Sequence, residues 1–149
     1  MRLDWDCIRD ILLCVEENTG LRKSCRFVDT SDDARKACEA TGTKMSEPAE
    51  YQIPLDEQYG NETLMYHIHY CCRDDSDLLD YYSDSTEMLV HIKDLSVAGH
   101  KTLSVIRQPA AWRKFKQIAA KVGISSLPTF INAVLKFGID SYTASISAQ

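Results

Sequence analysis

The segment from Met88 to Arg107 constrains the fold more than any other part of this 149-residue chain. Residues 88–92 are rich in strand-forming side chains, and Ser96, a residue type that often caps helices, follows closely. Apolar residues at helical spacing come next, among them Val97 and Leu103. The sequence therefore predicts a strand that runs straight into a helix, with a compact domain before it and helices packed on that domain after it.

Composition limits the class of protein. With 44% hydrophobic and 26% charged residues, the chain resembles a globular domain, and its length suits one core or a small domain with a helical extension. We find no apolar run long enough to span a bilayer, and the N-terminus has acidic residues where a signal peptide needs an apolar core. We therefore expect a cytoplasmic protein without a membrane partner.

Six cysteines in such a chain favour reduced thiols. Cys7 and Cys14 lie seven residues apart on a predicted helix, where they can fill core space. Cys25 and Cys38 lie in a polar segment and can pair or bind metal, although their loose spacing favours neither.

The first half of the chain has one clear helix and one segment that is difficult to interpret. Asp4 precedes an apolar pattern of helical period, so a helix is predicted over residues 5–18, ending before Gly20. Residues 20–52 are polar and are interpreted as a variable surface insertion that includes a short helix from residue 34 to 40. Residues 51–55 alternate, and Pro54 there predicts an edge strand.

The second half predicts a hairpin among helices. Residues 61–73 fit both a helix and a strand, and we favour a helix because Asn61 can cap it. Residues 78–82 and 88–92 flank a polar turn and predict a hairpin, and helices are expected from Pro109 to Val122 and from Leu127 onward. Apart from the short helix at residues 34–40, five helices and one hairpin give a mainly α fold of the α+β class.

This order of elements is typical of a winged helix-turn-helix domain. It divides the chain into a winged-helix-like domain at residues 1–107, with the insertion at 20–52, and a C-terminal helical extension at residues 108–149.

Three stretches resemble a known family. They are Asp4-Trp5-Asp6-Cys7-Ile8-Arg9-Asp10-Ile11-Leu12-Leu13 with Glu16-Glu17-Asn18, Tyr66-His67-Ile68, and Asp94-Leu95-Ser96-Val97-Ala98-Gly99-His100-Lys101-Thr102-Leu103 with Ile106-Arg107 and Trp112. This pattern is similar to that of the prophage-associated domain of unknown function 2513 family. The resemblance implies a winged-helix fold in a phage or prophage setting and carries over no catalytic residues. Residues 71–77 and Thr102 depart from the family pattern, which usually has a leucine-rich turn and a phenylalanine there.

Charge is unevenly distributed along the chain. Residues 1–60 carry 8 basic and 13 acidic side chains, residues 61–95 carry 2 and 8, and residues 96–149 carry 7 and 1. In a winged-helix protein the recognition helix enters the DNA groove, and the candidates for it are Tyr66, His67, His69, Tyr70 and Arg73. The acids near them, which include Asp74, Asp75, Asp77, Asp80 and Asp84, would repel a duplex.

Positive charge gathers instead on the C-terminal helices. The candidate residues for an anionic partner are Lys101, Arg107, Arg113, Lys114, Lys116 and Lys121. They can form an ordinary solvated helix face, bind phosphates, or dock on the acidic half of a second copy.

A metal site or an active site is not expected. His67, His69, Cys71 and Cys72 include ligand types, and a structural zinc site needs four ligands. His67 and Cys71 share one helix face, but His69 and Cys72 point elsewhere on the helix. We interpret them as core cysteines with half-exposed histidines. The chain has no phosphate-binding glycine loop and no hydrolase or zinc-protease motif.

The sequence therefore predicts a non-enzymatic accessory or regulatory protein that acts through protein–protein contacts. We expect an oligomer, such as a dimer, formed through the last two helices, with no cofactor and no small-molecule ligand. The alternative is a winged-helix transcriptional regulator that contacts DNA, mainly through the basic C-terminal face.

Overall fold

The computed structural model describes residues 1–73, 75–83 and 88–147 and is mainly helical, with a small antiparallel sheet. The predicted α+β class is confirmed. The elements are α1 (Trp5–Asn18), β1 (Cys25–Val28), α2 (Asp32–Thr41), α3 (Ile53–Tyr59), α4 (Asn61–Cys71), β2 (Leu79–Ser83), β3 (Leu89–Leu95), α5 (Val97–Ile106), α6 (Pro109–Val122) and α7 (Leu127–Ser147).

The predicted strand into helix is confirmed as β3 followed by α5. β3 is the central strand of the sheet, whose order is β1-β3-β2. Ser96 ends the strand and caps the helix, because its hydroxyl accepts a hydrogen bond from the backbone N–H of Gly99 at 3.0 Å. Val97, expected in the core, is instead 72% exposed, because it begins the helix at the surface of the domain.

The sheet has a third strand that the sequence did not predict. β1 pairs antiparallel with β3, from Cys25 opposite Ile92 to Val28 opposite Leu89. The interpretation of residues 20–52 as a surface insertion is therefore wrong for this part, where Cys25, Phe27 and Val28 are buried. Four residues are too few to show a periodic pattern. The short helix predicted within the same segment is present as α2.

The predicted edge strand at residues 51–55 is wrong. Its residues instead lead into α3, which accommodates Pro54 in its first turn, where a missing N–H costs nothing. The side chains of Tyr51 and Gln52 cover the free edge of β1. Gln52, fully buried, accepts from the Val28 N–H at 2.9 Å and donates to the Val28 carbonyl at 2.8 Å, and the Tyr51 hydroxyl bonds both backbone groups of Arg26.

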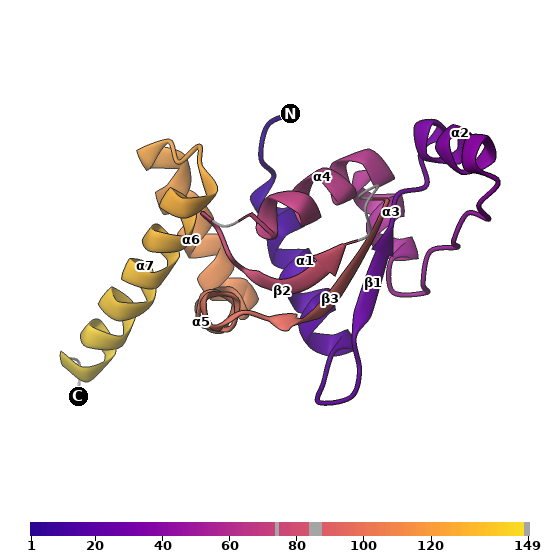
Figure 1. The fold of residues 1–149 in the computed structure, drawn as a ribbon. Helices are drawn as coiled ribbons and strands as arrows, with labels where there is room; N and C mark the ends of the chain where they lie inside the picture. The colour runs from indigo at the N-terminus through magenta and orange to yellow at the C-terminus, as the bar shows by residue number, and fades with distance from the viewer. Residues whose placement is uncertain (74, 84–87, 148–149) are drawn as a thin grey trace.

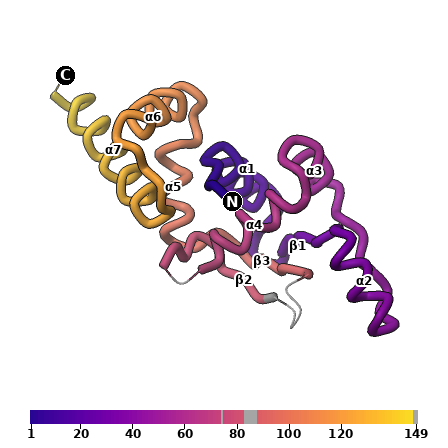
Figure 2. Tube along the Cα trace, turned by 90° about the horizontal axis from the view of Figure 1, so that it is seen from above, coloured from indigo at the N-terminus to yellow at the C-terminus, as the bar shows by residue number. Residues whose placement is uncertain are grey.

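One hydrophobic core joins the sheet to the C-terminal helices. Figure 1 shows α1 behind the sheet, with α5, α6 and α7 at one end of the molecule and α2 at the other, and the view from above in Figure 2 agrees. Trp5 of α1 stacks on Phe130 of α7 with ring centroids 4.5 Å apart, and Trp112 and Phe115 of α6 belong to the same cluster. Within the described ranges, no helix is both long and apolar enough to cross a membrane.

Close packing between α5 and the start of β2 gives a testable prediction. A Cβ atom added to Gly99 would lie 2.2 Å from the backbone oxygen of Leu78, so Gly99→Ala must push the helix away from the sheet. We expect this variant to lose about 2 kcal/mol of unfolding free energy in urea titrations, although alanine normally favours a helix. Gly20→Ala is the matched control, because nothing lies within 4 Å of its Cβ position. Equal stability of the two variants would contradict the packing argument.

Candidate functional site

The outward side of α4 carries most of the residues predicted for recognition. Glu62, Tyr66, His69, Tyr70 and Arg73 are spaced at three or four residues and are exposed or half-exposed; we call them the α4 face. The guanidinium of Arg73 lies 3.9 Å from the centre of the Tyr70 ring, and the rings of Tyr66 and Tyr70 are 5.2 Å apart. The face is therefore an aromatic strip with one cation stacked on it.

His67 does not belong to this face. Its side chain is fully buried, and both ring nitrogens bond backbone groups: Nε2 accepts from the Asp4 N–H at 2.8 Å, and Nδ1 lies 2.7 Å from the Thr63 carbonyl. The expectation of a half-exposed His67 is wrong because these two bonds satisfy the imidazole inside the protein. His67 thereby fastens the start of α1 to α4.

Acidic side chains are exposed on the segments before and after α4. The exposed acids are Glu57 on α3, Asp75 and Asp77 in the turn after α4, and Asp80 on β2. Asp74 and Asp84, which the sequence analysis counted among these acids, lie outside the described residues. The cations beside the face are Arg73 and Arg2, which lines a hollow together with Tyr70. Lys93 is on β3, where its amine lies 5.3 Å from the centre of the Tyr82 ring. This part of the surface is therefore acidic, as the charge distribution of the sequence predicted.

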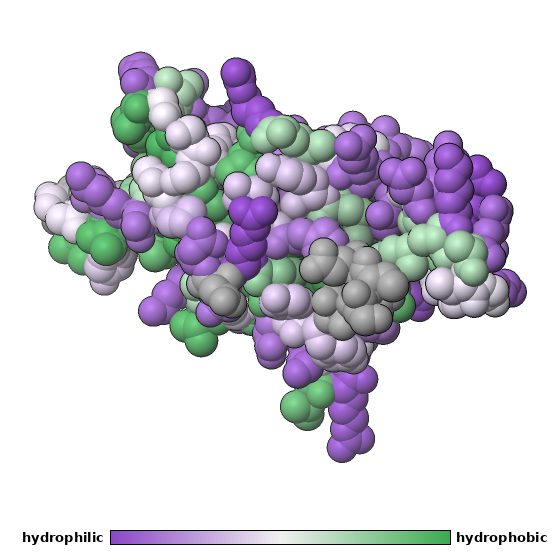
Figure 3. Space-filling model, turned by 45° about the horizontal axis from the view of Figure 1, so that its top comes forward, coloured by the Kyte–Doolittle hydropathy of each residue, from purple (hydrophilic) through white to green (hydrophobic). Residues whose placement is uncertain are grey.

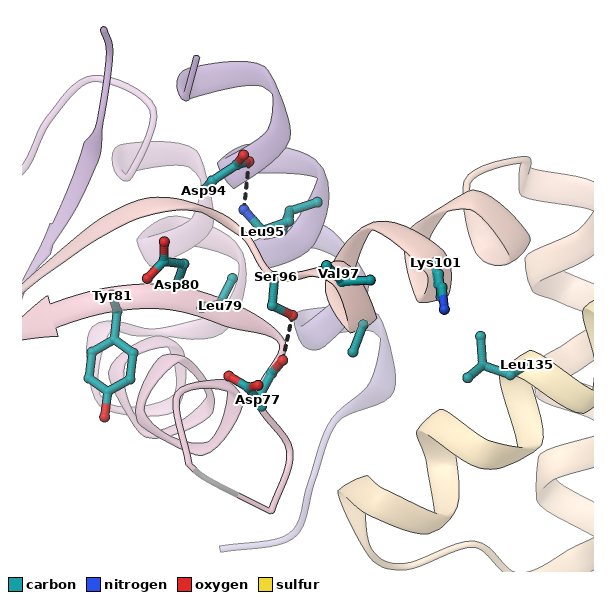
Figure 4. A pocket seen from close by; sticks show the side chains of 11 residues that line it. Asp77, Leu79, Asp80, Tyr81, Asp94, Leu95, Ser96, Val97, Lys101 and Leu135 are labelled. Atoms are coloured by element: carbon teal, nitrogen blue, oxygen red, sulfur yellow. Dashed lines mark hydrogen bonds between the residues drawn. The ribbon is translucent and has the colours of Figure 1, made fainter. Parts of the chain in front are cut away.

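A shallow hollow of about 810 Å³ lies where β2, β3, α5 and α7 meet. Figure 4 shows Asp77, Asp80 and Tyr81 on one side of it and Lys101 and Leu135 on the other. Val97 and Ala98 add apolar surface between them. No local pattern in the sequence predicts this hollow, because its walls come from three separate parts of the chain.

Two of the six predicted basic residues form ion pairs with acidic residues of the same chain. Arg107 forms an ion pair with Glu16 of α1, and Lys116 forms one with Asp6 at 3.0 Å. Trp112 also donates its indole N–H to Asp6, at 2.7 Å. These contacts attach the C-terminal helices to α1, so the charges of Arg107 and Lys116 are already paired within the molecule.

The other four basic residues do not form one surface. Arg113, Lys114 and Lys121 are exposed on the side of α6 that faces away from Trp112 and Phe115; we call them the α6 face. Within residues 1–73, 75–83 and 88–147, they have no ion pair. Lys101 lies apart from them on α5, at the hollow.

The cysteines are free thiols, and burial makes most of them unreactive. Burial raises the pKa of Cys7, Cys25 and Cys72 to about 12, which keeps these thiols protonated and poor metal ligands. Cys25 and Cys38 are not paired with each other. In the described part of the chain, no three histidine, cysteine or acidic side chains are grouped to hold a metal ion.

The contacts of Asp6 predict a pH dependence. Partial burial by itself raises its pKa, but the hydrogen bonds from Trp112 and Lys116 outweigh burial and hold the pKa below its ordinary value of 3.8. The pKa of Asp6 is lower in the folded chain than in the unfolded chain. The carboxylate therefore adds to the free energy of unfolding above pH 3.8, and this contribution is lost as the pH falls through the folded pKa.

We therefore expect Asp6→Asn to be less stable than the parent chain at neutral pH. The gap should narrow as urea midpoints are followed to pH values below 3.8. Asp140→Asn is the control, since Asp140 is exposed and lies far from this contact on α7. A gap of constant size across this range would show that the carboxylate charge is not what matters.

Comparison with known proteins agrees with the resemblance found in the sequence. The family model described as "Hypothetical protein (DUF2513)" matches residues 2–125, which include every element from α1 to α6. Neither the curated proteins nor the solved structures gave a match. The match extends over most of the chain, and the protein therefore belongs to the domain of unknown function 2513 family.

Proposed function

We propose that this chain is a non-enzymatic binding protein with a winged-helix arrangement that works through protein–protein contacts. Three features support the arrangement. α3 and α4 are joined at Gly60 as a helix-turn-helix, β2 and β3 form the hairpin of the wing, and β1 pairs with β3 to complete the sheet. The family resemblance suggests a phage or prophage setting, and the free thiols fit the reducing cytosol of a bacterial host.

The observation that carries the proposal is the charge around the α4 face. A DNA-reading helix draws much of its affinity from lysine and arginine contacts to phosphates. Around this helix, Arg73 and Arg2, which lies beside Tyr70, are outnumbered by four acids, and a duplex placed there would meet net repulsion; the acids are Glu57, Glu62, Asp75 and Asp77.

The composition of the α4 face suits a protein partner instead. Tyrosine and arginine are enriched at the centres of protein interfaces, because they supply large contact areas with a polar group at the end. Tyr66, Tyr70 and Arg73 provide such a centre, already ordered by the stacking of Arg73 on Tyr70. The acidic rim favours a partner with a basic surface.

A second candidate is a DNA-binding regulator that uses the α6 face. The observation in its favour is that Arg113, Lys114 and Lys121 are exposed on one side of a helix and unpaired within the described residues. Three such cations can contact phosphates without reading sequence. This reading places DNA on the side of the molecule formed by α6 and does not involve α4.

Titration of a random-sequence duplex against salt tests the leading proposal. We expect no measurable binding to the intact chain at low ionic strength, because the α4 face repels phosphate and the α6 face is small. Fluorescence anisotropy of a labelled duplex measures the affinity.

Variants separate the outcomes if binding is seen. A steep salt slope that disappears in the triple variant Arg113→Gln, Lys114→Gln, Lys121→Gln would favour the regulator. A loss of binding in Arg73→Gln, with the α6 variant unaffected, would show that α4 does contact DNA and would overturn the leading proposal. Lys36→Gln, on the exposed side of α2, is the charge-matched control.

A further inference from the structure

The second half of α7 extends beyond the body of the protein. Leu127, Phe130, Ile131 and Val134 in its first half are buried, whereas the described residues from Ile139 onward are all exposed. Figure 1 shows this end of the helix, in yellow, projecting from the molecule. Isolated helical segments shorter than roughly 12 residues are marginal in water, so the projecting half gains little stability by itself.

This projecting half exposes large apolar side chains on one side. Ile139 is 65% exposed, Tyr142 is 68% exposed and Ile146 is 52% exposed. With Leu135 they are spaced by four, three and four residues, which is the spacing of a coiled-coil seam. We call these four residues the α7 stripe; Figure 3 shows green side chains at the left end of the molecule, where α7 projects.

The stripe is continuous with the hollow between the sheet and α5. Leu135 lines the hollow together with Val97 and Ala98, and Val97 is 72% exposed. Figure 4 shows Leu135 directed from α7 toward this space. The apolar surface therefore begins in the hollow at the base of α7 and continues outward along the helix.

The order of the stripe makes it complementary to itself. Because the spacing of four, three and four is the same from either end, two copies related by a two-fold axis can pair antiparallel with all four positions in contact. Ile139 then lies against Tyr142 of the second copy, and Leu135 lies against Ile146 of the second copy. The tip of each helix reaches the hollow of the other copy.

The flanks of the stripe permit this close approach. Ser141, Thr143, Ala144 and Ser145 are small and uncharged, and Asp140 is the one charged residue between Ile139 and Ser147. Lipid surfaces usually require basic residues beside such a stripe, which this part of the helix lacks. The chemistry therefore fits a second apolar helix.

We infer that the chain forms a two-fold dimer in which the α7 stripes of two copies pack antiparallel, each tip resting in the hollow of the other copy. The inference rests on the proposed binding function and names a second copy of this chain as one of its partners. It does not involve the α4 face, so the two proposals fail separately.

Light scattering after size exclusion tests the inference on the full chain. We expect a dimer at micromolar concentration, and Ile139→Glu should raise the dissociation constant at least tenfold, because a charge would be buried in the seam. Ala144→Glu is the matched control: it adds the same charge to the opposite, exposed side of α7 and should leave the dimer intact. Circular dichroism checks that both variants fold.

Cross-linking tests the direction of pairing. Leu135→Cys and Ile146→Cys chains should form a disulfide when mixed and oxidised, whereas Ile146→Cys alone should not, since its two thiols lie on the order of 16 Å apart along an antiparallel seam. The parent chain, with its six native cysteines, is the control.

A monomeric parent chain, or equal dissociation of Ile139→Glu and Ala144→Glu, would overturn the inference. Cross-linking of Ile146→Cys alone would overturn the antiparallel geometry. A dimer that binds DNA through α4 would refute the proposed function while leaving the dimer standing.

Discussion

The architecture depends on the polar side of α1, which holds the C-terminal helices to the sheet. The opposite side of the helix buries Ile8, Ile11 and Leu12 in the core. On the polar side, Arg9 donates to the carbonyls of Ile106 and Arg107, at 2.8 and 2.6 Å, where α5 ends and its last backbone acceptors have no partner within the helix. Arg9 of α1 therefore supplies hydrogen-bond donors to the carbonyl groups at the end of α5, and the opposite side of α1 packs on the sheet.

This arrangement changes the meaning of the charge asymmetry. The excess of positive charge after residue 96 and of negative charge before it first suggests an external partner. Two of the opposite-charge contacts between the two halves are internal, from Glu16 to Arg107 and from Asp6 to Lys116. Part of the asymmetry thus serves assembly of the chain itself, and the charge outside these two contacts includes the acids near α4, the α6 face and Lys101 at the hollow.

The sequence predicted those elements whose signals are local. α1 has a cap at Asp4 and a long apolar pattern, and the unit of β3 and α5 has a cap at Ser96, so both were found. β1 and α3 were missed because they depend on distant contacts: Gln52 bonds the backbone of Val28 across 24 residues, which no periodicity reveals. The burial of His67 likewise follows from a bond to Asp4, 63 residues away.

The same limit applies to the proposed interaction surfaces. The α4 face was predicted because helical spacing brings Tyr66, Tyr70 and Arg73 together whatever the rest of the fold does. The α7 stripe repeats at regular spacing as well, but spacing alone does not say whether such a stripe is core or surface. That distinction depends on where the body of the protein ends. On α7, which begins at Leu127, beyond the family match that ends at residue 125, Val134 is the last buried residue of the described part and Phe137 still packs against the core, so the outer half of the helix adds apolar surface to the domain.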